Sequence, residues 1–197
     1  MARFHFVQKY EEEVIECIEN PLCLGRLGPP ISREEWLLKV AELVNDTIDN
    51  KRAVYFIGNG ASASMASHFS ADFSKCLGVT GMTIHDSSLL TCFSNDYSFE
   101  DSFREMLKIY FKKGDCLVAI SSSGESANVV NAADYVSSCG LGGLITFTGF
   151  DPGNRLCKLG DVNMHVDSKR YGIVEVAHAF HLHCLLDFLC ESRGVIR

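Results

Sequence analysis

The sequence predicts an α/β fold in which helices cover both faces of a parallel sheet, a three-layer αβα sandwich. Short, mostly apolar runs alternate along the chain with longer segments whose apolar residues recur at helical spacing. Such alternation is typical of parallel strands joined by crossover helices, and short continuous apolar runs are typical of strands buried on both faces. The predicted strands are 53–57, 82–85, 116–120, 144–147 and 162–166.

Two helices are predicted ahead of the first strand. The first covers residues 4–19, and a loop with glycines and prolines follows it. Ser32 precedes Glu35 by three positions, a capping-box pattern that begins the second helix. The apolar stripe of this helix must be covered, and a minimal sheet leaves it without a partner. We therefore expect the stripe to pack against other subunits of a homo-oligomer, a tetramer or at least a dimer. The stripe comprises Trp36, Leu37, Val40 and Val44.

Later helices are predicted from their boundary signals. One follows a glycine-containing turn and covers about 62–75, and a serine and an aspartate three residues apart can cap another over about 99–111. A helix over about 127–138 stops at Gly140, and the last and longest covers about 172–189.

The composition indicates one globular domain. A chain of 197 residues, 47% hydrophobic and 22% charged, can bury a full core. We expect a single domain over 1–197, with a helical oligomerisation segment over 1–52 and an α/β core over 53–197. The formal net charge of −7 argues against a nucleic-acid-binding surface.

Cysteine usage indicates a reducing compartment. The nine cysteines are spread along the chain without a Cys-x-x-Cys pair, and several lie in apolar runs, where a free thiol behaves as a small hydrophobe. The N-terminus carries no apolar signal segment, and no segment approaches the length that spans a bilayer. We expect reduced thiols, a cytoplasmic location and no membrane partner.

A run of serines follows the predicted strand 116–120 and precedes a predicted helix. Ser121, Ser122, Ser123 and Ser126 surround Gly124, so hydroxyls and free backbone N–H groups gather at one place. Such a place favours an anion, and a phosphate ester is the commonest candidate. No lysine follows the glycine, so the loop is not of the nucleotide triphosphate type. A serine-rich turn that only caps a helix explains the loop alone equally well.

Two further segments are expected at the same edge of the sheet, beyond the carboxyl ends of the strands, where ligands bind in such folds. The first segment is Gly58-Asn59-Gly60-Ala61-Ser62, directly after the strand 53–57. The second is Ser94-Asn95-Asp96.

Together these residues resemble the sugar isomerase (SIS) domain family, and within it the branch that isomerises heptose phosphates. The matching pieces are residues 58–62, His68-Phe69, Asn95-Asp96, residues 120–129, and the pair Glu175 and His183 with His178 between them. The resemblance implies a five-stranded parallel, flavodoxin-like sheet behind N-terminal helices. It also implies an aldose–ketose isomerase of a phosphorylated sugar, with sedoheptulose 7-phosphate and D-glycero-D-manno-heptose 7-phosphate as the expected pair.

The resemblance further assigns roles to individual residues. It implies that Asp72 is the general base and His183 the general acid. It implies a metal site, with one zinc ion per subunit, on His68, Asp72, Glu175 and His183. The implied substrate-binding residues are Asn59, Gly60, Ala61, Ser62, Asn95, Asp96, Ser121, Ser122, Ser123, Ser126 and Glu175.

The chemistry of these side chains suits the expected reaction. Isomerisation through an enediol needs a base for a carbon-bound proton and an acid for the carbonyl oxygen, and a carboxylate and an imidazole provide both near neutral pH. His68 and Asp72 are four residues apart and share one helix face. Two imidazoles and two carboxylates suit zinc. For this pair in isolation, an intrahelical hydrogen bond or a capped polar face is the simpler explanation, and Glu175 and His183 shift the balance toward a metal site.

Glu175 and His183 pose a geometric problem. Eight residues of straight helix separate two side chains by ~12 Å of rise. The helix would have to start after Glu175, or the ion would lie between the two side chains, or a neighbouring subunit would supply one ligand.

The chain also departs from the pattern of the family. Asp72 stands in place of a glutamate, Glu175 in place of a glutamine, Gly172 in place of an aspartate, and Ala61 in place of a glycine. Two other functions therefore stay open. One is a phosphosugar-binding or regulatory module without catalysis, and the other is an isomerase of a different phosphosugar.

Overall fold

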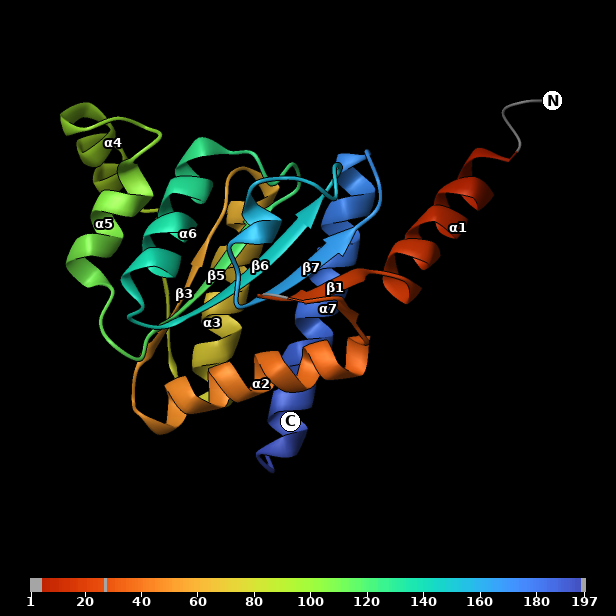
Figure 1. The fold of residues 1–197 in the computed structure, drawn as a ribbon, viewed down its shortest axis with the longest axis horizontal. Helices are drawn as coiled ribbons and strands as arrows, with labels where there is room; N and C mark the ends of the chain where they lie inside the picture. The colour runs from red at the N-terminus through yellow and green to blue at the C-terminus, as the bar shows by residue number, and fades with distance from the viewer. Residues whose placement is uncertain (1–4, 27, 196–197) are drawn as a thin grey trace.

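The computed structural model describes residues 5–26 and 28–195, which form a mixed sheet between two layers of helices (Figure 1). The strands are β1 (Leu22–Gly25), β2 (Pro30–Ile31), β3 (Ala53–Ile57), β4 (Thr80–Thr83), β5 (Cys116–Ser121), β6 (Gly143–Gly149) and β7 (Val162–Val166). The helices are α1 (Phe6–Glu19), α2 (Arg33–Asp49), α3 (Ala61–Leu77), α4 (Ser87–Asp96), α5 (Ser102–Tyr110), α6 (Ala127–Cys139) and α7 (Tyr171–Ser192), with a 3-10 turn η1 (Leu156–Lys158).

The predicted fold class is confirmed. Within the described residues the sheet order is β2-β1-β7-β6-β5-β3-β4, and the five strands from β7 to β4 are all parallel. Numbered along the chain, these five strands have the order 2-1-3-4-5 of flavodoxin-like folds. The ligand-binding crevice of such folds lies at the carboxyl ends of the central strands, here β3 and β5.

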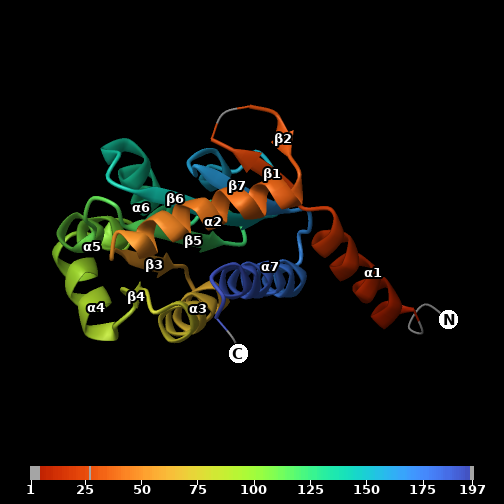
Figure 2. The same ribbon diagram turned by 90° about the horizontal axis from the view of Figure 1, so that it is seen from below.

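Alternate residues of each central strand supply two separate cores. Val54 and Phe56 of β3 face α2, α3 and α7, whereas Tyr55 and Ile57 face α5 and α6. This period of two follows from strand geometry. Figure 2 shows the two layers edge-on, with α3 and α7 side by side beneath the sheet.

An antiparallel hairpin extends the sheet where the sequence predicts only a loop. In this hairpin β1 pairs with β7, so that Cys23 lies opposite Met164, and β2 pairs with β1. The hairpin strands are four and two residues long, too short for a pattern of alternation to stand out. By pairing with β7, the hairpin covers a strand edge that would otherwise expose unpaired backbone groups.

The predicted packing of the α2 stripe is wrong. Trp36 is 2% exposed, and Val40 and Val44 are fully buried, all within one chain. The indole ring of Trp36 meets the ring of Phe147 on β6 edge to face, with centroids 5.7 Å apart. The sheet itself covers this stripe, because α2 lies across the face formed by β3, β5, β6 and β7.

The first helix is found where the sequence predicts it, over Phe6–Glu19, and residue 4 of the predicted range lies outside the described residues. It extends away from the body of the molecule (Figures 1 and 2). Its C-terminal half packs on α7 and buries Cys17, while Phe6, Val7 and Ile15 are 52–66% exposed. The Ser32 cap is confirmed as well, since Ser32 Oγ accepts a bond from Glu35 N at 3.1 Å.

Between β4 and α5 the structure contains α4, which the sequence did not predict. The side chain of Asp86 caps this helix by accepting bonds from the backbone N–H groups of Ser88 and Leu89. The helix predicted over 99–111 is the shorter α5. Asn95 and Asp96 therefore lie in the last turn of a helix and not in a loop after a strand.

Among the described residues, one helix is long and apolar enough to cross a membrane by length and composition alone, contrary to the sequence-based expectation. It is α7, with 22 residues and a mean hydropathy of 1.4 over the best window. More than half of that window, 56%, is buried inside the chain, as in the core helix of a globular domain. All nine cysteines lie in the described residues and are free thiols.

Candidate active site

The serine loop, residues 121–126, joins β5 to α6 at the carboxyl edge of the sheet. Ser121 and Ser122 are 4% and 6% exposed. Ser121 Oγ accepts a bond from Gly124 N at 3.2 Å and lies 3.4 Å from Ser126 Oγ. Ser126 is the N-cap residue of α6, yet its side chain makes no capping bond. The geometry therefore does not favour a turn whose serines only cap a helix.

Neighbouring segments hold the serine loop in its conformation. The backbone N–H of Gly149 donates to Ser122 O at 3.0 Å, and that of Leu156 donates to Gly124 O at 3.1 Å. Gly124 has a φ of +65°, and a Cβ there would overlap the buried side chain of Asn154. Only glycine fits this position, on both conformational and steric grounds.

The glycine turn, residues 58–62, follows β3 and lies beside the serine loop. The side-chain amides of Asn59 and Asn128 exchange two hydrogen bonds of 2.8 and 2.9 Å, which tie the turn to the first turn of α6. Gly60, at a φ of +55°, lets the chain turn directly into α3. The two loops are thereby fixed relative to each other.

The serine loop, the glycine turn and the start of α7 enclose a pocket of about 250 Å³. Three helices, α3, α6 and α7, begin at its wall, and their first backbone N–H groups favour a bound anion. The pocket is lined by Asn59, Gly60, Ala61, Ser62, Ser121, Ser122, Ser123, Ser126, Tyr171 and Glu175.

Nine of the predicted substrate-binding residues meet in this pocket, and two do not. Asn95 and Asp96 are exposed at the end of α4, where the Asn95 amide donates to the carboxylate of Asp96 at 3.0 Å. Within one chain they are not part of the lining. The resemblance to the family implies their role in substrate binding, and that role stays a prediction.

A second group of predicted residues meets on the outer face of α3 and α7. We call His68, Asp72 and His183 the histidine cluster, because their potential ligand atoms all lie within 4.8 Å of one another. His68 Nε2 is 3.4 Å from Asp72 Oδ2, and the rings of His68 and His183 have centroids 5.4 Å apart. His68 and His183 are exposed, whereas the Asp72 side chain is 27% exposed.

Glu175 is not part of the histidine cluster. The last helix is continuous from Tyr171 to Ser192, so the possibility that it starts after Glu175 is excluded. Glu175 lies at the pocket, and His183 lies two turns further along, ~12 Å away along the helix axis. The predicted set of four ligands is therefore not assembled within one chain.

Tyr171 lines the pocket and was not predicted from the sequence. It precedes Glu175 by four residues, so the two side chains share one face of α7, a spacing that could have revealed it. The neighbouring Gly172 faces α1, since a Cβ there would lie 2.7 Å from the hydroxyl oxygen of Tyr10. At this position, where the family carries an aspartate, α1 therefore packs closely against the start of α7.

The imidazoles of His165 and His178 are buried and both bond to Thr148 of β6. His178 Nε2 bonds to Thr148 O at 3.0 Å, and His165 Nδ1 bonds to the Thr148 hydroxyl at 3.1 Å. Burial lowers the pKa of His178 to about 4 and lowers the pKa values of His165 and His85 as well. These three side chains are neutral near pH 7 and serve as packing and hydrogen-bonding groups.

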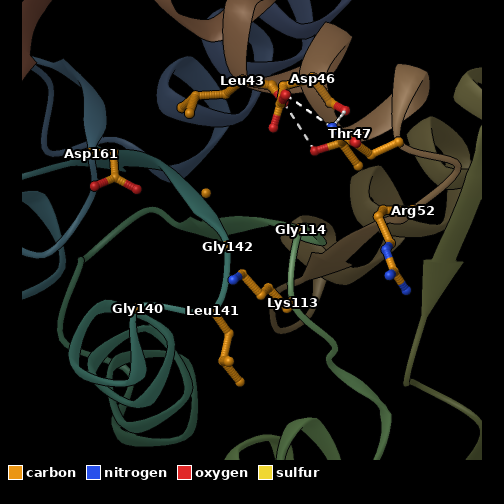
Figure 3. Close-up of a pocket in the computed structure, with 12 residues that line it drawn as sticks. Leu43, Asp46, Thr47, Arg52, Lys113, Gly114, Gly140, Leu141, Gly142 and Asp161 are labelled. Carbon is orange, nitrogen blue, oxygen red and sulfur yellow. Dashed lines mark hydrogen bonds between the residues drawn. The ribbon is translucent and has the colours of Figure 1, made fainter.

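A larger concavity, about 600 Å³, lies at the opposite edge of the sheet (Figure 3). Figure 3 shows α2 on one side and the segment 140–143 on the other. Two carboxylates at its wall already have partners: Asp161 pairs with Arg26 at 3.0 Å, and Asp46 accepts a bond from Asn50. None of the predicted site residues lines this concavity.

Comparison with known proteins agrees with this geometry. The SIS domain family matches residues 31–149. A phosphoheptose isomerase of Shewanella sp. strain ANA-3 is 31% identical over 189 residues, 92% of this chain and 93% of the relative. That of Aliarcobacter butzleri is 32% identical over 164 residues, 79% of this chain and 85% of the relative.

Solved structures agree as well. The phosphoheptose isomerase of Neisseria gonorrhoeae superposes with a TM-score of 0.76 at 27% identity, covering 95% of this chain and 96% of the other. A pocket at the carboxyl edge of the sheet and a histidine cluster further along α3 and α7 are thus combined with a family match over more than half of the chain. The chain belongs to the SIS domain family, and it is an isomerase similar to the phosphoheptose isomerases.

Proposed function

We propose that this isomerase converts sedoheptulose 7-phosphate to D-glycero-D-manno-heptose 7-phosphate. One observation carries the proposal: an anion-binding pocket and a cluster of two imidazoles and a carboxylate lie on the same pair of helices, α3 and α7. The names of the relatives support the choice of heptose phosphate. The phosphate ester would bind the serine loop, and the sugar would extend from it.

Asp72 and His183 would move the protons. The carboxylate of Asp72 takes the proton from C1 of the ketose, while the imidazolium of His183 donates a proton to the C2 carbonyl oxygen, which gives an enediol. Asp72 then returns its proton to C2, and His183 takes the proton from the C1 hydroxyl to form the aldehyde. Each group ends in its starting protonation state.

The histidine cluster suits a zinc ion. Its donor set of two imidazoles and one carboxylate matches that of catalytic zinc sites, which have three protein ligands and one open position. Tetrahedral coordination places donor atoms roughly 3.3 Å apart, and the 3.4 Å between His68 Nε2 and Asp72 Oδ2 is close to this. His183 would bind such an ion as a neutral imidazole, so in the zinc-loaded site the ion, in place of the imidazolium, would polarise the sugar carbonyl, and it would also orient the sugar hydroxyls.

We further propose that the complete site forms between subunits of a homotetramer. His68 lies six residues beyond Ser62 on α3, ~9 Å along the axis, so the histidine cluster and the pocket of one chain are well separated. Apolar side chains on α7 are exposed beside the cluster, Val176 by 49% and Phe180 by 46%. Association through this face would bring a cluster of one subunit toward a pocket of another.

Two expectations about the chain as a whole also stay proposals. Residues 1–197 would act as one domain, in which 1–52 contributes to association and 53–197 binds the sugar phosphate. The nine free thiols support a reducing compartment, and we propose that the chain works in the cytoplasm.

Turnover of sedoheptulose 7-phosphate by the zinc-loaded protein tests the proposal, with both sugars followed by NMR. We expect turnover by the natural protein, and a loss of at least ~100-fold in kcat in Asp72→Asn and His183→Gln, the size typical of a lost general acid or base. Glu191→Gln, an exposed change on the same helix, should leave kcat unchanged. Absence of turnover by folded, metal-loaded protein would exclude this activity.

The two alternatives separate in the same assay. An isomerase of a different phosphosugar would turn over a shorter or epimeric substrate faster than the heptulose. A regulatory module would bind phosphosugars in calorimetry yet turn over none of them. Asp72 is one methylene shorter than the glutamate that the family carries there. This difference is the reason to test both alternatives.

A further inference from the structure

Tyr171 is the one aromatic side chain among the residues that line the pocket. All the others are small or polar, so its ring is the largest apolar surface offered to a ligand there. It is nevertheless 61% exposed in the single chain, at the first position of α7.

Phe150 packs against Tyr171 and has an unusual backbone. The two rings meet edge to face, with centroids 4.8 Å apart and planes at 71°. Phe150 has a φ of +64°, one of two positive values among the described residues other than glycine. A bulky side chain rarely adopts this conformation, and residues that do so gather at functional sites.

The strained position is fixed on both sides. The backbone N–H of Phe150 donates to Ser168 O at 3.1 Å, and that of the preceding Gly149 donates to Ser122 O in the serine loop at 3.0 Å. A Cβ on Gly149 would lie 2.8 Å from the methyl groups of Val174, so α7 packs closely here. One short segment thus joins the serine loop, the ring of Phe150 and the start of α7.

We propose that Tyr171 contacts the carbon chain of the phosphosugar and sets which chain length is accepted, and that Phe150 positions its ring. This inference rests on the proposed function. A sugar phosphate has a charged end, which suits the serine loop, and C–H faces, which suit an aromatic ring. The phenol hydroxyl adds a hydrogen-bonding group at the far end of the ring.

The test is a comparison of ketose phosphates with five, six and seven carbons in the natural protein and in Tyr171→Ala, Tyr171→Phe and Phe150→Ala. We expect KM for the preferred sugar to rise about tenfold in Tyr171→Ala, about threefold in Phe150→Ala, and less than about threefold in Tyr171→Phe. Tyr171→Ala should discriminate less between the five-, six- and seven-carbon sugars than the natural protein does. The inhibition constant of inorganic phosphate, which reports on the serine loop alone, should stay within about twofold.

Two controls separate this role from general damage. Tyr97→Ala removes a tyrosine of the same exposure, 61%, outside the pocket lining, and should change none of these constants. Phe150→Gly also removes the ring, so it should raise KM as Phe150→Ala does. Because glycine suits the positive φ, Phe150→Gly should unfold at a higher denaturant concentration than Phe150→Ala.

The outcomes also distinguish this inference from the proposed function. Equal KM values and equal chain-length preference in the natural protein and Tyr171→Ala would overturn the inference, even with full turnover. If no sugar is turned over, dissociation constants from calorimetry replace KM. A loss of sugar affinity without loss of phosphate affinity in Tyr171→Ala would then still support the contact. A changed molecular mass with unchanged constants would assign Tyr171 to a subunit contact instead.

Discussion

Gly124 shows how a single residue fixes the anion-binding loop. Its positive φ and the adjacent side chain of Asn154 both exclude a Cβ. Gly140 provides a matched control, because it has a similar φ of +61° and open space around it. Gly140→Ala should lower the free energy of unfolding by about 1 kcal/mol through backbone strain alone.

Gly124→Ala should lower the free energy of unfolding by more than Gly140→Ala does. It should also weaken phosphate binding, because the loop must move to relieve the overlap with Asn154. We expect its affinity for inorganic phosphate to fall at least tenfold, while Gly140→Ala keeps the natural affinity. Denaturant unfolding and calorimetry measure the two effects. Equal phosphate affinity in both variants would show that the loop does not depend on this contact.

His178 gives the chain a predictable response to acid. Its imidazole is completely buried, and burial lowers its pKa to about 4, against about 6.5 in the unfolded chain. Between these values the unfolded state binds more protons, so stability is complete above pH 6.5 and falls as the pH drops toward 4. His165, whose pKa burial also lowers, acts in the same direction.

We expect the free energy of unfolding to drop by about 2 kcal/mol between pH 7 and pH 5 from His178 alone. Urea unfolding across this range measures the drop, and NMR titration reports the imidazole directly. An imidazole that titrates near 6.5 in the folded protein would contradict the burial argument. His178→Gln should flatten the pH dependence.

At the level of single residues, the sequence predicted local groups better than distant ones. The serines of the loop follow a strand and precede a helix, so their position could be inferred from neighbours. Gly149 and Asn154 support the same loop from about 30 residues further along the chain, and no local pattern indicates these contacts. Tyr171 was missed because it lies one residue before the last helix as predicted, over about 172–189.

Among the elements, α7 determines which ligands can meet. Its continuous turns hold Glu175 at the pocket and His183 at the cluster. We therefore expect one zinc per chain in the natural protein and in Glu175→Ala, and none in His68→Ala or His183→Ala. Metal analysis of dialysed protein measures this. Loss of the metal in Glu175→Ala would instead mean that a glutamate of another subunit completes the site.

The five parallel strands could be predicted because burial on both faces makes each a short, nearly continuous apolar run. The hairpin of β1 and β2 and the helix α4 could not, because they are short and depend on pairing with distant segments. Trp36 illustrates a different error. Its stripe was correctly recognised as apolar, but periodicity does not say what covers a stripe, and α2 crosses the sheet of its own chain.

For the whole molecule, the exposed apolar face of α7 predicts the oligomeric state. A lysine at Phe180 would place a charge where burial against another subunit is expected, so Phe180→Lys should lower the mass measured by light scattering at micromolar concentration. Ile109→Lys is the control, since Ile109 is 53% exposed on α5, a helix of the opposite layer. A natural protein that is monomeric under these conditions would refute the proposed tetramer.

The pocket where α3, α6 and α7 begin contains no lysine or arginine among its lining residues. Any attraction for a dianion there comes from peptide dipoles and hydroxyls, which carry no counterions to be released. Phosphate affinity should consequently change little between dilute and concentrated sodium chloride, unlike that of a site made from mobile ammonium groups. The one acidic residue in the lining, Glu175, repels a dianion, and added salt screens that repulsion, so phosphate affinity should not fall as the salt concentration rises.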